Sequence, residues 1–283
     1  MLTAEQKQLR QQFIGSSDAA AILGCDPYRT PADVWLEKTG KVDQFEGNEN
    51  TDRGNLLEPV ILNWAEKELG VELIRDQMFT DGCLCANVDA LVRNAGSIVE
   101  AKSSVLSESW GDPGTDDIPE QYLIQVHHAL RLTERDLAHV PVLLPAYRKF
   151  DFRMYRVERD DRLAELIAGQ LIAWWDMYVK RDIPPENYQP SMEVLKRVRR
   201  IPAIKQDVPD HLVTLWLMTK EQAKAAKEAA DEAQRQVVAA LNNAEAGRCS
   251  KGTLTYFETT RRAHSVEEST FRTLRWKPLK ENQ

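Results

Sequence analysis

The chain has 283 residues, of which 42% are hydrophobic and 29% charged, so it can fold around a substantial core. The first residues lack the apolar run of a signal peptide, and no stretch approaches the roughly 20 apolar residues of a membrane helix. We therefore expect a cytoplasmic protein with no membrane partner. The formal net charge of −7 argues against a uniformly basic surface, so any contact with nucleic acid is expected to be local, in a channel.

Several common chemistries lack their sequence signatures. The chain contains no Gly-x4-Gly-Lys-Ser/Thr phosphate loop, no His-Glu-x-x-His zinc helix and no Gly-x-Ser-x-Gly elbow. The cysteines form no Cys-x-x-Cys pair, so we predict reduced thiols: Cys25, Cys83, Cys85 and Cys249.

The start of the chain is predicted to form short helices. The first covers Asp18 to Leu23, with Ser16 or Ser17 as its N-cap and Gly24 at its end. A second covers residues 30–40, where a capping threonine precedes a proline and a glycine ends the helix.

A longer helix and a group of strands are predicted next. Residues 53–69 place apolar side chains at helical intervals, carry Glu58 and stop at Gly70. Short segments rich in Val, Ile and Leu then alternate with turn sequences, which predicts strands joined by hairpins: residues 71–79, 83–92 and 97–104.

The remaining elements complete a mixed sheet flanked by helices, an α/β fold. Helices are predicted at residues 119–132 and about 160–180, and strands at 138–144 and 150–157. After residue 190 the composition becomes that of a solvated helical extension, so we predict domains at 1–190 and 191–283. In the extension, residues 220–241 are expected to pair with 209–218 as a helical arm, and residues 252–276 to form a terminal strand or hairpin.

Three charged residues interrupt neighbouring predicted strands. Asp89 lies on one strand, and Glu100 and Lys102 lie two residues apart on the next, so their side chains share a face. An isolated spacing of this kind usually reflects a turn residue and a surface ion pair. Here the preceding Ile98 and Val99 make the second strand apolar, where unpaired charge is costly.

Two carboxylates and an amine suit metal-assisted phosphodiester hydrolysis, because Mg²⁺ is commonly held by one or two carboxylates. The main-chain carbonyl of Ala101 is a further candidate ligand. Lys102 is expected to orient the attacking water or to stabilise charge on the phosphate.

A series of motifs resembles, in order, the lambda-exonuclease-type, YqaJ-like phage recombination nucleases of the PD-(D/E)XK superfamily. The motifs are IGSSDAAAILGCDPYRTPADVWLEKTG, RGNLLEPVI, ANVDALV, VEAKSS and IPEQYLIQVHHAL, within about Phe13 to Pro185. The resemblance implies a restriction-endonuclease-like fold. It also implies that Asp89 and Glu100 bind metal, that Lys102 is the catalytic lysine, that Glu58 supports the site as a further metal ligand, and that Gln125 lines it.

The resemblance further implies the residues that contact DNA: Ser16, Ser17, Arg10, Arg53 and Tyr122. Arg29 is another candidate for the terminal phosphate. Capping explains the two serines equally well, and an aromatic residue at helical spacing, such as Tyr122, is more often part of a core.

The implied activity is Mg²⁺-dependent degradation of linear duplex DNA from the 5′ end, with Mn²⁺ able to replace Mg²⁺. The implied partners are DNA, two further copies of the chain in a trimeric ring, and a single-strand annealing protein, in a phage-encoded or prophage-encoded system. Two positions depart from the pattern: Ala90 replaces the usual glycine after the first aspartate, and Ala101 is a small residue between acid and lysine.

Three alternatives compete with this function on the sequence alone, and the first two lack a feature that they require. An iron-sulfur nuclease needs clustered cysteines near the C-terminus, which this chain lacks. A DNA-end-binding or scaffolding protein on an inactive nuclease fold requires loss of an acid or of the lysine, and none is missing. An endonuclease of the same superfamily shares every motif.

Overall fold

The computed structural model describes residues 11–43, 45–105, 107–146, 149–202, 204–258 and 260. The chain separates into two compact units, Met1–Arg200 and Ile201–Gln283, which are described one at a time. In the described part of the chain, no helix combines the length and apolar character needed to cross a bilayer.

The first unit is built on a mixed seven-stranded sheet. Its strands are β1 (Ile14–Gly15), β2 (Leu73–Asp81), β3 (Leu84–Val92), β4 (Ser97–Val99), β5 (Lys102–Ser103), β6 (Leu137–Ala146) and β7 (Lys149–Glu158). β2 and β4 pair antiparallel with β3, whereas β4 and β5 follow each other in parallel along β6, and β7 closes the other side of β6. The predicted hairpins are confirmed by this topology.

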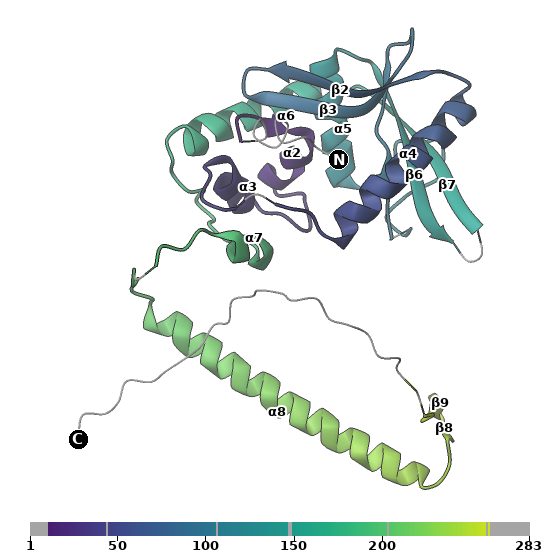
Figure 1. Cartoon of the computed structure of the whole chain (residues 1–283), viewed down its shortest axis with the longest axis vertical. Helices are drawn as coiled ribbons and strands as arrows, with labels where there is room; N and C mark the ends of the chain where they lie inside the picture. The colour runs from purple at the N-terminus through teal and green to yellow at the C-terminus, as the bar shows by residue number, and fades with distance from the viewer. Residues whose placement is uncertain are drawn as a thin grey trace. The chain divides into compact units, whose positions relative to one another are not determined.

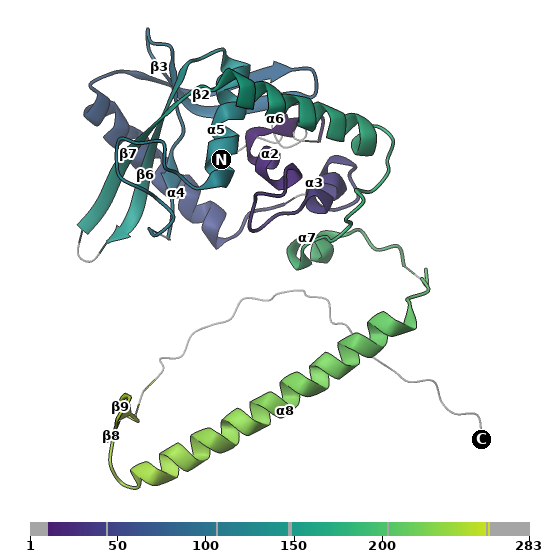
Figure 2. The same ribbon diagram turned by 180° about the vertical axis from the view of Figure 1, so that it is seen from behind.

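Helices cover both faces of this sheet, as Figures 1 and 2 show. They are α2 (Ser16–Ile22), α3 (Pro31–Lys38), α4 (Glu49–Leu69), α5 (Glu120–Thr133) and α6 (Asp161–Trp174), which continues into the π-helical turn η1 (Trp175–Val179). α5 packs on a cluster that includes Leu91, Ile98 and Tyr155, while α4 packs on a cluster that includes Ala90 and Val99. The predicted α/β fold, a mixed sheet flanked by helices, is confirmed.

At Asp89, strand β3 departs from the regular alternation of side chains between its two faces. Val88 belongs to the cluster under α5, but Ala90 belongs to the cluster under α4, although strict alternation would place both on one face. Opposite Asp89 in the hairpin, Asp76 has a positive φ of 54°. This local irregularity lies at the first predicted catalytic residue.

The first helix begins differently from the prediction. Its N-cap is Gly15, and the N3 residue Asp18 accepts a hydrogen bond from the Gly15 amide at 3.0 Å. Neither Ser16 nor Ser17 is the cap, because the helix already includes both. The second helix starts as expected, with Thr30 capping through Asp33 and a proline at the first position.

Helix α4 exposes part of the apolar pattern that predicted it. It begins at Glu49, earlier than expected, because Asn48 caps it by accepting a hydrogen bond from the Thr51 amide. Ile61 is buried, but Leu56 is 76% exposed and Val60 49% exposed. Helical spacing therefore identified the helix correctly but did not identify its buried face.

The first unit extends beyond the predicted domain boundary at residue 190. A helix absent from the prediction, α7 (Met192–Arg197), follows the long α6–η1 segment. Its Val194 joins the core with α2 and α3, and Arg197 forms an ion pair with Glu37. These contacts tie α7 to the first unit, so the compact unit ends at Arg200.

The second unit contains one long helix, α8 (Asp210–Leu241), and the hairpin of β8 (Ala246–Cys249) and β9 (Gly252–Thr255). The predicted pairing of 209–218 with 220–241 is wrong, because both segments lie on this continuous helix. Of the strand or hairpin predicted at residues 252–276, a strand is present at Gly252–Thr255, but its partner β8 precedes the predicted range. Residues 259 and 261–276 of that prediction lie outside the described residues.

Helices α2 and α5 are joined by a buried histidine. His128 Nδ1 lies 3.1 Å from Ser16 Oγ, and burial lowers the pKa of His128 from 6.5 to about 4. The unfolded chain therefore binds a proton near pH 6.5 that the folded protein excludes until about pH 4. Stability from this group is complete above pH 6.5 and is lost as the pH falls toward 4.

We predict that His128→Gln reduces the pH dependence of stability. Between pH 7 and 5 the wild-type free energy of unfolding should fall by about 2 kcal/mol more than that of the variant. Denaturant titrations at both pH values measure this difference, with His211→Gln, an exposed histidine of α8, as control. Equal pH dependence in wild type and His128→Gln would contradict the assignment.

Candidate active site

The predicted catalytic residues meet at the point where strands β3 and β4 stop pairing with each other. β3 and β4 pair as far as Ala90 and Val99, and the chain then continues along β6 in the same register through Glu100 to Lys102. The Glu100 amide donates to the His139 carbonyl at 3.0 Å, which keeps this run extended. The structure thus divides the single predicted strand into β4 and β5 but keeps Glu100 and Lys102 on one face.

Beyond this point the backbone of β3 no longer pairs with the neighbouring segment, and the side chain of Asp89 bonds to it instead. The Ala101 amide donates a hydrogen bond of 2.7 Å to Asp89 Oδ2. This bond fixes the Asp89 carboxylate beside the peptide that joins Glu100 to Lys102. Cross-strand geometry and a side-chain hydrogen bond therefore bring the three residues together, as the sequence predicts.

Glu100, Lys102 and Gln125 form a connected polar cluster. Lys102 Nζ lies 2.8 Å from Glu100 Oε1 and 3.1 Å from Gln125 Oε1, and Gln125 Nε2 donates to the same Glu100 oxygen. Lys102 Nζ also lies 5.0 Å from the ring centroid of Tyr122. Tyr122 and Gln125 are three residues apart on α5, so one helix face supplies both.

The site concentrates negative charge away from water. Burial and the charge of Glu100 raise the pKa of Asp89 well above its ordinary value, despite the opposing charge of Lys102. Burial likewise raises the pKa of Glu58, with contributions from Asp76 and Glu100. Each ionised carboxylate is thus destabilised by its neighbours, which a cation would relieve.

Lys102 is held as an ammonium ion. Burial alone would lower the pKa of Lys102, but the adjacent Glu100 and Asp89 carboxylates outweigh burial and raise it. A charged Lys102 can donate hydrogen bonds and stabilise negative charge, but it cannot accept a proton.

The donor set fits a hard divalent cation. Glu100 Oε2 is buried and has no hydrogen-bond partner among the described residues, which is costly for a carboxylate oxygen. Asp89 uses Oδ2 for the Ala101 amide, so two carboxylates converge with coordination capacity left. Across the described residues, no three His, Cys, Asp or Glu side chains are grouped to hold a metal, so Glu58 does not complete a third ligand here.

The residues predicted to contact DNA are not equivalent in the structure. Ser16 is only 5% exposed and its hydroxyl faces His128, whereas Ser17 is exposed. Arg53 is partly exposed on α4, and Tyr122 lies beside Lys102. Arg10 lies outside the described residues.

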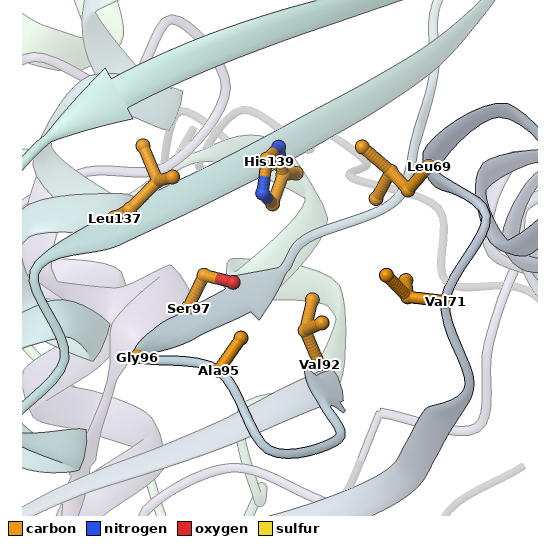
Figure 3. A pocket seen from close by; sticks show the side chains of 8 residues that line it. All are labelled: Leu69, Val71, Val92, Ala95, Gly96, Ser97, Leu137 and His139. Atoms are coloured by element: carbon orange, nitrogen blue, oxygen red, sulfur yellow. The ribbon is translucent and has the colours of Figure 1, made fainter.

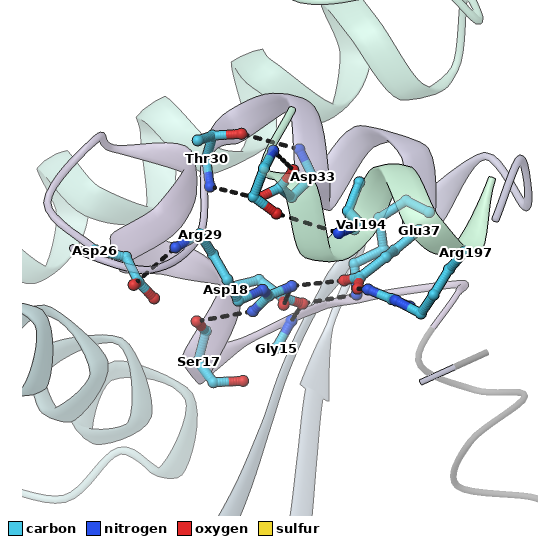
Figure 4. A network of polar contacts seen from close by, with 12 residues as sticks. Gly15, Ser17, Asp18, Asp26, Arg29, Thr30, Asp33, Glu37, Val194 and Arg197 are labelled. Atoms are coloured by element: carbon cyan, nitrogen blue, oxygen red, sulfur yellow. Dashed lines mark hydrogen bonds and ion pairs between the residues drawn. The ribbon is translucent and has the colours of Figure 1, made fainter. Parts of the chain in front are cut away.

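Arg29 belongs to a polar network that stabilises the N-terminal helices (Figure 4). Arg29 Nη2 lies 2.9 Å from Asp18 and 2.6 Å from Glu37, and Lys38 Nζ lies 2.6 Å from Asp18. Although burial opposes it, the charges of Lys38 and Arg29 hold the pKa of Asp18 well below its ordinary value. The Arg29 charge is therefore compensated within the fold, and so the side chain is a weaker candidate for a phosphate than Arg53.

A cavity of about 370 Å³ lies elsewhere on the sheet (Figure 3). Its wall is mainly apolar and is formed by Leu69, Val71, Val92, Ala95, Gly96, Ser97, Leu137 and His139. None of the predicted catalytic side chains lines it. The candidate site is instead the charged cluster of Glu100, Lys102 and Gln125 beside Asp89.

Comparisons with known proteins agree with this geometry. Residues 5–136 match the YqaJ-like viral recombinase domain family. The "Uncharacterized protein YqaJ" of Bacillus subtilis (strain 168) is 29% identical over 261 residues, which cover 84% of this chain and 78% of that protein. The alkaline exonuclease LHK-Exo from Laribacter hongkongensis is 20% identical with a TM-score of 0.51, covering 64% of this chain and 97% of that one. Its complex with dAMP gives 21% identity and a TM-score of 0.50.

The fold is restriction-endonuclease-like, similar to that of solved exonuclease structures. Over residues 5–136 the chain is similar to the YqaJ-like viral recombinase domain, and most of its length is similar to the YqaJ protein of Bacillus subtilis. The resemblance stated from the sequence motifs is thereby confirmed.

Sequence reasoning missed the aromatic residues behind the site. Trp110 stacks on Tyr122 with ring centroids 5.5 Å apart, and Tyr155 packs against Trp110 at 5.1 Å. Trp110 lies in a loop rich in Gly, Asp and Pro, where no periodicity marks a buried position. A lone tryptophan in a polar segment was the available signal.

We predict that Asp89→Asn stabilises the metal-free protein and abolishes its response to divalent cations. Asparagine keeps an acceptor for the Ala101 amide but removes a buried charge whose raised pKa marks it as destabilising at pH 8. The gain should be on the order of 1 kcal/mol. Thermal unfolding with EDTA and with MgCl2 measures both effects.

The control is Asp231→Asn, which removes an exposed charge from α8. It should leave the metal-free stability and the Mg²⁺-induced rise in Tm unchanged. Full retention of that rise by Asp89→Asn would exclude Asp89 as a ligand.

Proposed function

We propose that this protein is a metal-dependent exonuclease that degrades linear double-stranded DNA from the 5′ end and leaves 3′ single strands for homologous recombination. The observation that carries the proposal is the buried Glu100–Lys102–Gln125 cluster beside Asp89, with one Glu100 oxygen left without a partner. The exonuclease names of structurally similar proteins support the reaction class.

The proposed roles follow from the contacts of each residue. Asp89 and Glu100 would hold Mg²⁺, or Mn²⁺ in its place, with the Ala101 carbonyl as an additional ligand. The bound cation would supply a Lewis acid for the phosphate and lower the pKa of water. Lys102, held as an ammonium, donates to the attacking water or to a phosphate oxygen as charge develops.

Other residues position these groups and the substrate. Gln125 bonds both Glu100 and Lys102, so it fixes their separation. Glu58 adds negative charge near the site and favours a bound cation. For DNA we propose contacts from Ser17, Arg53 and Tyr122, with the buried Ser16 acting through the backbone of its segment, and Arg10 near the terminal phosphate.

We predict that the wild type removes nucleotides from 5′-labelled linear duplex in Mg²⁺ and leaves a closed circle intact. Glu100→Gln and Lys102→Met should each lower the rate by about 100-fold or more, because each removes charge that acts on the transition state. Gel analysis of 5′-labelled and 3′-labelled duplexes gives both rate and polarity.

The matched controls are Glu228→Gln and Lys224→Met, an exposed pair 4.0 Å apart on α8. Rapid cutting of the circle would favour an endonuclease of the same fold. Binding of DNA ends without hydrolysis in Mg²⁺ or Mn²⁺ would favour a scaffolding protein.

We further propose that the protein acts as a trimeric ring around DNA and delivers its 3′ strand to a single-strand annealing protein. Enclosure would reconcile the formal charge of −7 with DNA binding. Light scattering should give a mass of about three chains, the assembly that the resemblance to lambda-exonuclease-type nucleases implies. A monomer with and without DNA would exclude the ring.

A further inference from the structure

A stack of aromatic rings connects the back of the sheet to the proposed catalytic lysine. Tyr155 on β7 packs against Trp110, Trp110 stacks on Tyr122, and the Tyr122 ring faces the Lys102 ammonium at 5.0 Å. Trp110 and Tyr155 are buried, whereas Tyr122 is partly exposed. The stack therefore runs from the core to the edge of the site.

The loop that carries Trp110 is fixed to β7 by several bonds. The Tyr155 hydroxyl donates to the Gly111 carbonyl at 2.7 Å, directly after Trp110. On either side of Tyr155, the Gly114 amide donates to Met154 O at 2.8 Å and the Arg156 amide donates to Thr115 O at 3.0 Å. The loop is thus held along β7 by hydrogen bonds, without forming a strand.

Gly111 allows this loop to close tightly. Its amide donates to the Asp117 carbonyl at 2.9 Å, and a Cβ at residue 111 would overlap the Asp117 side chain. The backbone next to Trp110 is consequently held in one place, which gives the indole a defined position against Tyr122.

We propose that Trp110 is a positioning residue for Lys102 and acts through the ring of Tyr122. This inference rests on the proposed nuclease function of the same site. A lysine side chain has many rotamers, and its ammonium is fixed here by two hydrogen-bonding partners and one aromatic face. Trp110 sets the position of that face, so it directs the ammonium without touching substrate.

The alternative is that Trp110 only fills the core, and a matched tryptophan distinguishes the two roles. Trp174 is also buried, and its indole nitrogen, like that of Trp110, has no hydrogen-bond partner among the described residues. Trp174 belongs to the other hydrophobic cluster, with α2 and α3. Loss of either indole should destabilise the fold, but only loss of Trp110 should disturb Lys102.

The first test compares Trp110→Leu, Trp110→Phe and Trp174→Leu in the full chain. Both leucine variants should lower Tm. Only Trp110→Leu should lower kcat on linear duplex, by about tenfold or more, because a misplaced catalytic group costs rate at unchanged binding. Its midpoint for Mg²⁺ should stay within about twofold of wild type, and Trp110→Phe should recover most of the rate. KM for DNA does not distinguish the two roles, because Tyr122 is also a proposed DNA contact. Equal kcat in the two leucine variants would overturn the proposal.

A second readout does not require nuclease activity. The Tyr122 ring current should shift the ε-methylene resonance of Lys102, which is assigned by its disappearance in Lys102→Met. That shift should be lost in Trp110→Leu, partly reduced in Tyr155→Phe and retained in Trp174→Leu.

If Trp110→Leu fails to fold, Tyr155→Phe, which keeps the ring but removes its bond to Gly111, decides the question. An inactive wild type with these shifts would reject the nuclease function alone, and an unchanged shift in the Trp110 or Tyr155 variant would reject the positioning role.

Discussion

The dominant constraint on this structure is the repulsion between two carboxylates, Asp89 and Glu100, that the fold shields from water. Asp89 and Glu100 are adjacent because β3 and β4 pair as far as their chain neighbours Ala90 and Val99, and Glu100 is buried while Asp89 is partly buried. Burying like charges side by side is unfavourable unless a cation compensates them. Lys102 supplies one positive charge, and the unpartnered Glu100 oxygen indicates where more is needed. A proposed catalytic centre of this kind lowers the stability of the fold. Contacts in the rest of the unit must therefore compensate for it.

The surrounding elements hold this arrangement by constraining backbone before side chains. β6 fixes the extended run from Ser97 to Ser103, and the Asp89 side chain completes it at Ala101. Helix α5 then adds Gln125 and Tyr122 from one face. Each charged group thus has its direction set by at least two elements of the fold. In α2, similarly, one side chain has two roles. Asp18 accepts a hydrogen bond from the N-cap residue Gly15, and it also compensates the charges of Arg29 and Lys38.

Much of the fold and the centre of the site could be predicted from the sequence because both depend on local patterns. Alternation and turn residues identified the β2–β3–β4 hairpins, and a spacing of two residues identified the shared face of Glu100 and Lys102. The features that were missed depend on contacts between distant segments. Helix α7 is held by Glu37 and the N-terminal core, and the loop around Trp110 is held by β7, so neither carries a periodic signal. The exposure of Leu56 and Val60 could not be predicted from their spacing either. Helical spacing shows that residues share one face of a helix but not whether another element covers that face.

The direction of the Lys102 pKa shows why geometry was needed to assign its role. The sequence leaves the direction of this pKa open, because burial lowers the pKa of a lysine whereas adjacent carboxylates raise it. In the structure, Glu100 lies within hydrogen-bonding distance and Asp89 is close, and their charges outweigh burial. Neutralising those carboxylates with a bound cation would weaken this effect, so the protonation of Lys102 and the occupancy of the metal site are linked. A lysine whose charge responds to the metal beside it needs a fixed position in both states, and that position cannot depend on Glu100 alone. The uncharged partners Gln125 and Tyr122 are therefore the ones able to hold the ammonium whichever charges surround it.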